Sequence, residues 1–342
     1  GFLQHAAMDD RAAIGDVVIG LGHLAGILQG GGRFDDSCGK VHATAMARQP
    51  TIAVFTKNRV NPAYDAARLA ADRVAAEAGA RAVHYVPQIP DHVGQQKALA
   101  AEALAARPDA VILNPTDDLQ MEEDLARFAA AEIPVVLIIN RMKGKAVAFV
   151  GSDDEAIGRK AADALVASLQ GKGRVVALEG LSSVPTSRAR MRGLHDSLAR
   201  APGIEFLGAR VGHLLQEPAK AAMAELLAAH PNIDGVWTAN DMMAFGALDA
   251  LRDAGRTATV VGVNGLPAAI DHIEHGRMLA SVDFSAFNIA AIATRAVLRH
   301  LAGKPVPPEI MVPAELIDRS NCHRWKLPFE QRPCPAWDEI VR

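Results

Sequence analysis

Short apolar runs alternate with longer segments of helical length along the chain, from Thr51 to Leu301. The apolar runs are continuous rather than alternating, which is typical of strands that helices cover on both faces. The expected strands are 51–55, 82–86, 110–113, 134–139, 146–150, 174–178, 205–211, 235–238 and 259–263. The expected helices are 63–78, 92–106, 119–132, 154–169, 188–200, 218–230, 242–254, 267–275 and 286–301.

This alternation predicts βαβ units and therefore parallel sheets. The series of strands and helices ends near residues 150–153 and then starts again. We therefore expect an α/β protein with two doubly wound parallel-sheet lobes. The segment from Asn321 to Arg342 is rich in proline, tryptophan and charge and has no clear period, so we expect it to lie over the surface.

Composition agrees with two lobes and argues against one class of partner. A chain of 342 residues is too long for one ordinary core and suits two domains. Half of the residues are hydrophobic and only 4% are aromatic, which favours tight helix–sheet packing over an aromatic-rich β-sandwich. The net charge is -3 without a long run of one sign. Nucleic-acid binding usually leaves a basic face, so we expect no nucleic-acid partner.

Residues 1–47 precede the regular pattern, and two interpretations of them stay open. The run from Ile14 to Leu28 is fairly apolar, and Ala43–Ala47 has the small-x-small pattern that signal peptidase accepts. Glycines and Asp16 interrupt the run, so the region is either a signal region or an N-terminal extension. No uninterrupted apolar stretch reaches about 18 residues, and we expect no transmembrane helix.

The three cysteines show no CxxC pair and no zinc-binding spacing, so we expect no metal site. Cys322 and Cys334 could form a disulfide in an oxidising compartment, or both could be unpaired thiols. The glycines at 20, 22 and 26 do not match a dinucleotide fingerprint, because the last one is a residue too far along. No P-loop, Gly-x-Ser-x-Gly motif or marked catalytic triad occurs, so we expect neither a cofactor nor an enzyme.

Asparagine follows several of the expected strands. Ligands of open parallel sheets bind beyond the carboxyl ends of the strands, and an amide both donates and accepts, as a hydroxyl does. Asparagine is also common there because it caps helices, but convergence of five from two lobes favours a binding site for a hydroxylated ligand. The five are Asn61, Asn114, Asn140, Asn240 and Asn264.

Three arginines, Arg188, Arg190 and Arg192, lie near the start of an expected helix. Cations are disfavoured at that end of a helix, so a ligand contact would explain at least one of them, and a solvated face explains Arg192. Tyr64 follows Asn61 closely. Its ring could stack on an apolar sugar face or could belong to the core.

From Thr51 to about Ser320 the sequence resembles the type I periplasmic sugar-binding proteins, the ribose-binding group in particular. The segment Leu113–Asp117 (Leu-Asn-Pro-Thr-Asp) is one of the matching stretches. No single stretch is decisive, but their order and spacing together are specific. The others are 52–54, 61–62, 133–135, 140–141, 151–154, 186–193, 229–231, 239–247 and 260–264.

The resemblance implies a ligand pocket between two lobes that are joined by a three-segment hinge near Ser152, Phe284–Ser285 and Val312–Pro313. It divides the chain into an N-terminal lobe (48–151 plus 285–311), a C-terminal lobe (152–284 plus 312–325) and a tail (326–342). The implied ligand-binding residues are Asn61, Tyr64, Asn114, Asn140, Arg141, Arg190, Asn240, Asn264, Asp283 and Phe284.

Two features depart from the family pattern. Asn140 and Asn264 stand where the family usually has aspartate, and Ala63 replaces a common aromatic residue. Charge-assisted hydrogen bonds are roughly twice as strong as neutral ones, and arginine suits carboxylate and phosphate. The chain keeps two arginines and lacks the two carboxylates. Two ligand classes therefore stay open, a neutral sugar or polyol and a sugar acid.

The function that the resemblance implies is capture of a small polar solute in the periplasm, by a monomer, for delivery to the membrane permease of an ABC transporter. The alternative is the ligand-sensing domain of a sugar-responsive transcription regulator, which carries an N-terminal helix-turn-helix of about 50–60 residues. Residues 1–50 have about that length, but Asp16–Gly32 is rich in glycine and lacks a recognition helix with basic flanks.

Overall fold

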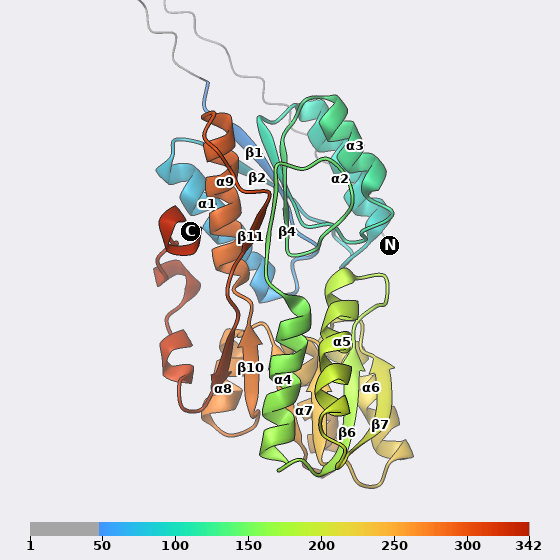
Figure 1. Ribbon diagram of the computed structural model, residues 1–342. Coiled ribbons are helices and arrows are strands. Elements are labelled where there is room, and N and C mark those ends of the chain that lie inside the picture. Colours follow the sequence, from blue (N-terminus) through green and yellow to red (C-terminus); the bar gives the residue numbers. More distant parts are fainter. Residues whose placement is uncertain (1–47, 342) are drawn as a thin grey trace, which may run out of the picture. The chain divides into compact units, whose positions relative to one another are not determined.

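The computed structural model describes residues 48–341, so Cys38 and the two interpretations of residues 1–47, signal region or N-terminal extension, lie outside the described residues. Two six-stranded sheets form the centre of this part of the chain (Figure 1). None of the described helices combines the length and the apolar character that crossing a membrane requires.

The N-terminal lobe is built on a fully parallel sheet with the order β11-β5-β4-β3-β1-β2. Helices α1 and α9 pack together on one face, and α2 and α3 pack together on the other (Figure 1). The strands are β1 (Thr51–Phe55), β2 (Arg81–Tyr85), β3 (Ala110–Leu113), β4 (Val135–Ile138), β5 (Ala148–Gly151) and β11 (Glu309–Met311). The helices are α1 (Pro62–Glu77), α2 (Val93–Ala106), α3 (Glu122–Ala130) and α9 (Ala286–Leu301).

The C-terminal lobe repeats this plan with the order β12-β10-β9-β8-β6-β7, in which only β12 is antiparallel to its neighbour. Helix α4 packs against α5, and α6 packs against α7. The strands are β6 (Gly173–Glu179), β7 (Ile204–Val211), β8 (Gly235–Thr238), β9 (Thr259–Val263), β10 (Ala280–Asp283) and β12 (Glu315–Asp318). The helices are α4 (Asp154–Ser168), α5 (Pro185–Ala199), α6 (Gln216–Ala229), α7 (Asp241–Asp253) and α8 (Pro267–Glu274).

The predicted α/β fold with two doubly wound lobes is confirmed. Helix α3 begins later than predicted because Asp117 accepts hydrogen bonds from the backbone of Leu119 and Gln120 and forms a turn there. Helix α5 begins earlier, at Pro185, a residue suited to the first turn of a helix. The short strands β10, β11 and β12 were not among the expected strands, because polar residues interrupt them and they lack a continuous apolar run.

Three chain segments connect the two sheets, between β5 and α4, between β10 and α9, and between β11 and β12. Ser152 lies in the first segment, and its hydroxyl contacts the other two. It donates to the carbonyl of Val312 at 2.7 Å and lies 3.3 Å from that of Phe284. One buried hydroxyl therefore ties all three connections together.

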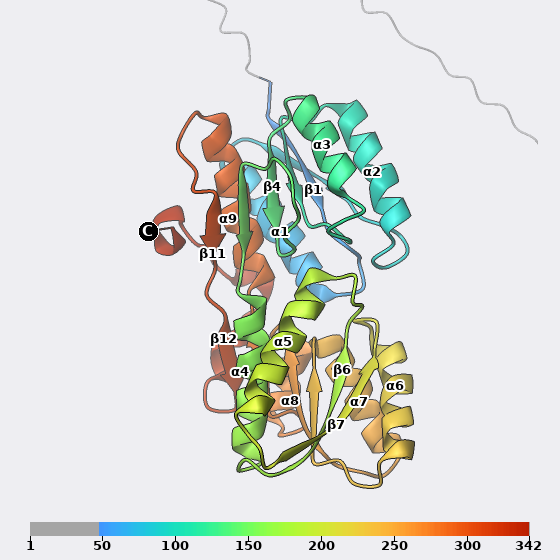
Figure 2. The same ribbon diagram turned by 45° about the vertical axis from the view of Figure 1, so that its right-hand side comes forward.

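After β12 the chain crosses from one lobe to the other once more. The 3-10 turn η1 (Cys322–Trp325) packs on α8, whereas η2 (Phe329–Gln331) contacts α1 and α10 (Trp337–Ile340) contacts α9. Figure 2 shows this last segment running along the side of the molecule that carries β12, β11 and α9. It lies on the surface as predicted, and Cys322 and Cys334 are free thiols.

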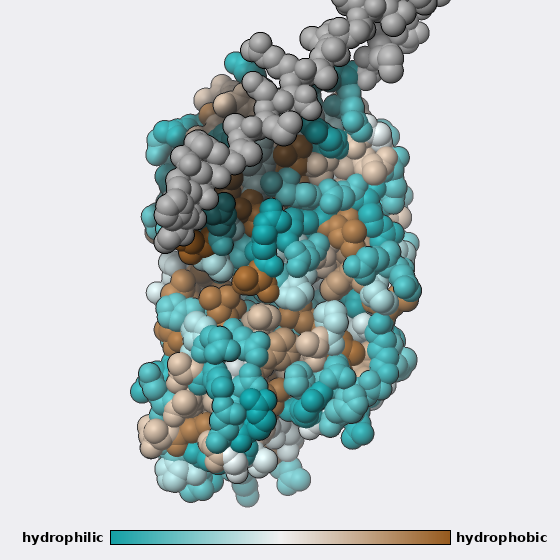
Figure 3. Space-filling view, turned by 180° about the vertical axis from the view of Figure 1, so that it is seen from behind, coloured by the Kyte–Doolittle hydropathy of each residue, from teal (hydrophilic) through white to brown (hydrophobic). Residues whose placement is uncertain are grey.

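Buried apolar residues fill the space between sheets and helices, with β1, β3, β4, β5 and β8 almost wholly buried. Figure 3 shows one outer face, on which hydrophilic side chains are mixed with smaller groups of hydrophobic ones. Helices α4 and α5 can approach closely because Gly158 has no side chain. A Cβ at this position would lie only 2.1 Å from the carbonyl oxygen of Arg190. This contact fixes the position of Arg190 relative to α4.

Candidate functional site

A small cavity of about 30 Å³ lies between the two lobes, at the carboxyl ends of the strands of both sheets. This volume holds a water molecule or two, so a sugar-sized solute requires the lobes to move apart before it enters. The cavity is lined by Lys57, Asn58, Asn61, Tyr64, Asp91, Ile139, Thr186, Arg190, Leu214, Asn240, Asn264 and Phe284.

The N-terminal lobe contributes an ion pair to this cavity. Lys57 follows β1, its side chain is 1% exposed, and its ammonium lies 3.7 Å from the Asp91 carboxylate. Burial lowers the pKa of Lys57, and the charge of Asp91 opposes that change. Asn58 donates to the same carboxylate at 3.3 Å. Asp91 adopts a positive φ of 57°, which is uncommon outside glycine, so this corner of the site has a strained backbone.

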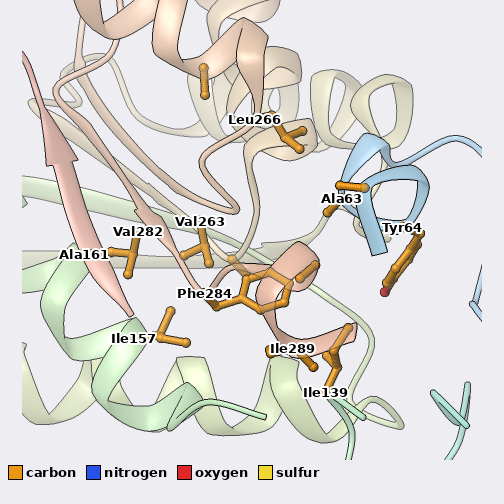
Figure 4. Close-up of a cluster of buried hydrophobic side chains, with 14 of the residues drawn as sticks. Ala63, Tyr64, Ile139, Ile157, Ala161, Val263, Leu266, Val282, Phe284 and Ile289 are labelled. Carbon is orange, nitrogen blue, oxygen red and sulfur yellow. The ribbon is translucent and has the colours of Figure 1, made fainter. Parts of the chain in front are cut away.

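Apolar and aromatic surfaces border the cavity as well. In Figure 4 the ring of Phe284 lies between Ile139 and Ile289 on one side and Val263 and Val282 on the other. Tyr64 stands apart from this group, on the N-terminal lobe. Burial raises the pKa of its hydroxyl, so Tyr64 is a neutral hydrogen-bonding group at ordinary pH.

The C-terminal lobe contributes a second ion pair. The guanidinium of Arg190 binds the Asp154 carboxylate at 2.9 Å and donates to the carbonyl of Ala239 at 2.8 Å. Burial raises the pKa of Asp154, and the charge of Arg190 opposes this effect. The guanidinium also lies 5.2 Å from the centre of the Phe284 ring.

Several of the predicted asparagines carry buried polar atoms without a hydrogen-bond partner in the protein. These atoms are the Asn140 and Asn264 carbonyl oxygens and both amide atoms of Asn114. Asn114 adjoins Tyr64, Asn140 follows the cavity residue Ile139, and Asn264 lines the cavity itself. An unpaired buried polar group costs about 1–3 kcal/mol, so these atoms suit a polar molecule that enters between the lobes.

Asn61 and Asn240 line the same cavity but also cap helices. The Asn61 carbonyl accepts from the backbone of Ala63 at 3.0 Å. Asn240 accepts from Met243 and donates to the carbonyl of Leu214. Each of these two asparagines therefore caps a helix and also lines the cavity. Both the oxygen and the nitrogen of the Asn240 amide already have a partner in the protein.

Arg141 and Asp283 lie outside the cavity. Arg141 is about half exposed, pairs with Glu309, and stacks 3.9 Å from the centre of the Phe149 ring. It lines an adjoining hollow of about 420 Å³ with Arg188 and Arg192, and this hollow shares Ile139 and Thr186 with the cavity. Asp283 accepts from the Trp325 indole at 2.8 Å and from the backbone of Ser285 at 2.6 Å, and so belongs to the connection between β10 and α9.

Residues that the sequence analysis missed complete the lining of the cavity. Lys57, Asn58 and Asp91 lie in loops after β1 and β2, Ile139 follows β4, and Thr186 and Leu214 follow β6 and β7. A survey of the first charged or polar residues after every strand would have included Lys57. Nothing in the sequence pairs Lys57 with Asp91, because their contact depends on the neighbouring positions of β1 and β2.

This fold, with a polar cavity that both lobes line, defines the chain as a two-lobed binding protein. The model of the periplasmic binding protein domain matches residues 52–305. The chain belongs to this periplasmic binding protein family, as the resemblance in sequence predicted.

Individual relatives agree with this assignment. The chain is 27% identical over 280 residues to the ribose import binding protein of Escherichia coli strain K12, covering 81% of this chain and 93% of the relative. It is 32% identical over 210 residues to the ribose import binding protein of Bacillus subtilis, covering 61% and 68%. A solved ABC transporter solute-binding protein from Actinobacillus succinogenes with bound D-allose superposes with a TM-score of 0.77 and 27% identity, covering 81% of this chain and all of the other.

Proposed function

We propose that this chain captures a small neutral sugar or polyol between its lobes and delivers it to the membrane permease of an ABC transporter. One observation carries the proposal: buried amide atoms of Asn114, Asn140 and Asn264 have no hydrogen-bond partner in the protein. Asn264 lines the inter-lobe cavity, and the other two adjoin residues that line it. Amides donate and accept, and therefore complement hydroxyl groups. The named ligands of the relatives, ribose and allose, are rich in such groups.

The balance of charge supports a neutral ligand over a sugar acid. Each cation at the cavity has a carboxylate of its own, since Lys57 faces Asp91 and Arg190 binds Asp154. Arg141, the other arginine on which an anionic ligand would depend, pairs with Glu309 away from the cavity. The two carboxylates missing at positions 140 and 264 are thus replaced by two others, and no cationic charge is left over for an anion.

Lobe closure is the proposed mechanism. The N-terminal lobe supplies Lys57 and the asparagines at 114 and 140, and the C-terminal lobe supplies Arg190 and Asn264. A solute held by both sets favours the closed arrangement, because only contacts that differ between open and closed states shift their populations. The connections around Ser152 would act as the hinge.

The rest of the proposal follows from the family. We propose that the chain works in the periplasm as a monomer, binds its solute without chemical change, and contacts a permease when closed. The relatives are import binding proteins, and this favours a transport role over the ligand-sensing domain of a transcription regulator.

Thermal unfolding with a panel of solutes tests this function. D-Ribose, D-allose, myo-inositol and gluconate serve as probes, and calorimetric titration of those that stabilise the protein follows at two salt concentrations. A solute at 100 times its Kd adds about 2.7 kcal/mol of stability. We expect a neutral solute of this panel to stabilise the protein, and we expect its affinity to depend little on the salt concentration. Salt-sensitive binding of gluconate alone would contradict the neutral class.

A further inference from the structure

We propose that Asp241 is a positioning residue of the candidate site: together with Ser281 it holds the loop after β9 in the conformation that places Asn264 at the inter-lobe cavity. This inference rests on the proposed function, in which Asn264 contacts the solute. Asp241 is not one of the described residues that line the cavity, so it would act on the solute only through the backbone of this loop.

The backbone of Asn264 has a conformation that needs support. Its φ is 136°, in a region that residues other than glycine rarely adopt, and Gly265 follows with a φ of 65°. A strained residue of this kind costs about 1–3 kcal/mol and persists only where the surrounding structure holds it. Asn264 is also the residue of this loop that lines the cavity, and its buried carbonyl oxygen has no hydrogen-bond partner among the described residues. The strain therefore lies at a residue of the candidate site.

Three consecutive backbone N–H groups of this loop have separate acceptors. Asn264 donates to a carbonyl of β10 at 2.9 Å and so extends the pairing between β9 and β10. Gly265 donates to the Ser281 hydroxyl at 3.0 Å, and Leu266 donates to the Asp241 carboxylate at 2.9 Å. Two side chains therefore hold the backbone for two residues beyond the last bond to the sheet.

Asp241 also holds the other of these two side chains. The Ser281 hydroxyl donates to Oδ1 of Asp241 at 2.7 Å, which leaves the hydroxyl oxygen free to accept from Gly265. Burial raises the pKa of Asp241 to about 6, so at neutral pH the group is ionised and both oxygens accept. Asp241 and Ser281 are fully buried, so solvent does not replace these bonds. The carboxylate packs on Gly262, where a Cβ would overlap Oδ1.

The place of Asp241 in the chain gives it a second connection to the site. It is the first residue of α7 and directly follows Asn240, which lines the cavity. Its carboxylate therefore links the loop after β8 to the loop after β9. A negative charge in the first turn also stabilises a helix, so the experiment has to separate support of α7 from placement of Asn264.

A double-mutant cycle on solute affinity makes this separation. The single variants are Asp241→Ala and Asn264→Ala, and calorimetric titration uses whichever of D-ribose, D-allose and myo-inositol stabilises the wild type most. Each single variant should raise Kd by about tenfold, and the double variant should stay within about twofold of Asn264→Ala, because residues of one network have non-additive effects. Independent effects would multiply to about a hundredfold, and this result would overturn the proposal.

Two further variants separate positioning from a general loss of stability. Asp241→Asn keeps one oxygen that can accept from Leu266, so it should recover part of the affinity that Asp241→Ala loses. Asp234→Asn is the matched control, because Asp234 also accepts from a backbone N–H of the C-terminal lobe, that of Arg174 at 2.8 Å, but precedes β8 at the opposite end of the sheet. It should lower the free energy of unfolding and leave Kd unchanged. Equal rises in Kd for Asp234→Asn and Asp241→Ala would overturn the proposal.

Nuclear magnetic resonance of the ligand-free protein tests the same role without a solute. In Asp241→Ala the amides of Gly265 and Leu266 should exchange their hydrogens faster, and the side-chain amide signal of Asn264 should shift. If both stay as in the wild type, the proposal is wrong even where affinity falls. If no probe binds but both change, the role of Asp241 stands and the proposed function is wrong. Should circular dichroism show that Asp241→Ala does not fold, Ser281→Ala replaces it in both experiments, because it removes only one of the two supports.

Discussion

Arg188 on α5 of the C-terminal lobe donates to Asp118, which follows β3 of the N-terminal lobe, at 2.8 Å. The pair therefore joins the two lobes outside the cavity. Arg188 also donates to the carbonyl of Ser182, so its side chain is held in position before the lobes meet. Under the proposed lobe closure, this pair would be a contact of the closed state.

The first prediction concerns this inter-lobe pair. Arg188 is 42% exposed and Asp118 is 20% exposed, so the pair stabilises closure by only about 0.2–1 kcal/mol. Asp118→Asn should weaken solute binding by a few-fold at low salt, and the difference should shrink at high salt because salt screens exposed charges. Calorimetric titration at two ionic strengths measures both effects. A loss of affinity that is independent of salt would contradict the electrostatic origin.

The second prediction concerns Arg190. Arg190→Ala removes a buried cation from the cavity and leaves the Asp154 carboxylate unpaired. We expect a loss of roughly 2–4 kcal/mol in binding free energy. Arg192→Ala is the matched control, because Arg192 lies on the same helix, is 62% exposed and binds Glu155 instead. Equal affinities for the two variants would show that Arg190 does not contact the solute.

The third prediction concerns the glycine that lets α4 and α5 approach. A Cβ at Gly158 would meet the backbone of Arg190 at 2.1 Å, so Gly158→Ala must push the two helices apart. Overpacking of this kind costs typically 1–3 kcal/mol, and it should also displace Arg190 and weaken solute binding. Urea unfolding and titration measure the two losses. Ala167→Ser, at an exposed position of α4, is the control and should change neither quantity.

The fourth prediction concerns pH. Burial raises the pKa of Asp241 to about 6, although its carboxylate accepts from Leu266 and Ser281. The folded chain therefore binds more protons at this group than the unfolded chain between pH about 4 and 6. The contribution of Asp241 to the free energy of unfolding should fall as pH rises through that window, by roughly 3 kcal/mol in all, and should be constant above it.

Urea unfolding at several pH values checks this prediction. Asp241→Asn removes the titrating group, so the difference in stability between wild type and variant should change with pH only between about 4 and 6. The variant also loses one hydrogen bond, which lowers its stability by a constant amount of about 1 kcal/mol. A constant difference over the whole pH range would mean that Asp241 has an ordinary pKa.

The fifth prediction concerns the C-terminal segment. The Trp325 indole donates to the half-buried Asp283 at the end of β10, where the chain leaves the C-terminal sheet. Trp325→Phe keeps most of the packing but leaves this carboxylate short of a donor, so it should lower the free energy of unfolding by about 1–3 kcal/mol. Trp337→Phe, at a half-buried ring next to Arg299, should cost less. Chemical denaturation compares the two.

Much of the fold could be predicted from the sequence because its signals are local. The strand 110–113 and the helix 286–301 have the predicted bounds, since continuous apolar runs and helix-length segments report directly on covered strands and helices. The short strands β11 and β12 could not be predicted from the sequence. They exist as strands because they pair with β5 and β10 in the folded protein.

The sequence predicted some residues of the candidate site and not others, for a physical reason. Strand order places the residues that follow parallel strands at one edge of a sheet, so six of the ten predicted site residues line the cavity: Asn61, Tyr64, Arg190, Asn240, Asn264 and Phe284. Strand order does not determine the direction in which a side chain points. Arg141 has the position of a site residue but turns toward Glu309 and Phe149, whose approach depends on β11 beside β5.

The sequence by itself thus determined the two lobes and the polar residues at the strand ends, because both depend on local periodicity and on the handedness of βαβ units. Only the tertiary structure decided the charge of that site. Lys57 meets Asp91, and Arg190 meets Asp154, across 34 and 36 positions of sequence. Such pairings arise when helices and strands pack, and the hydrophobic periodicity of the chain does not indicate them.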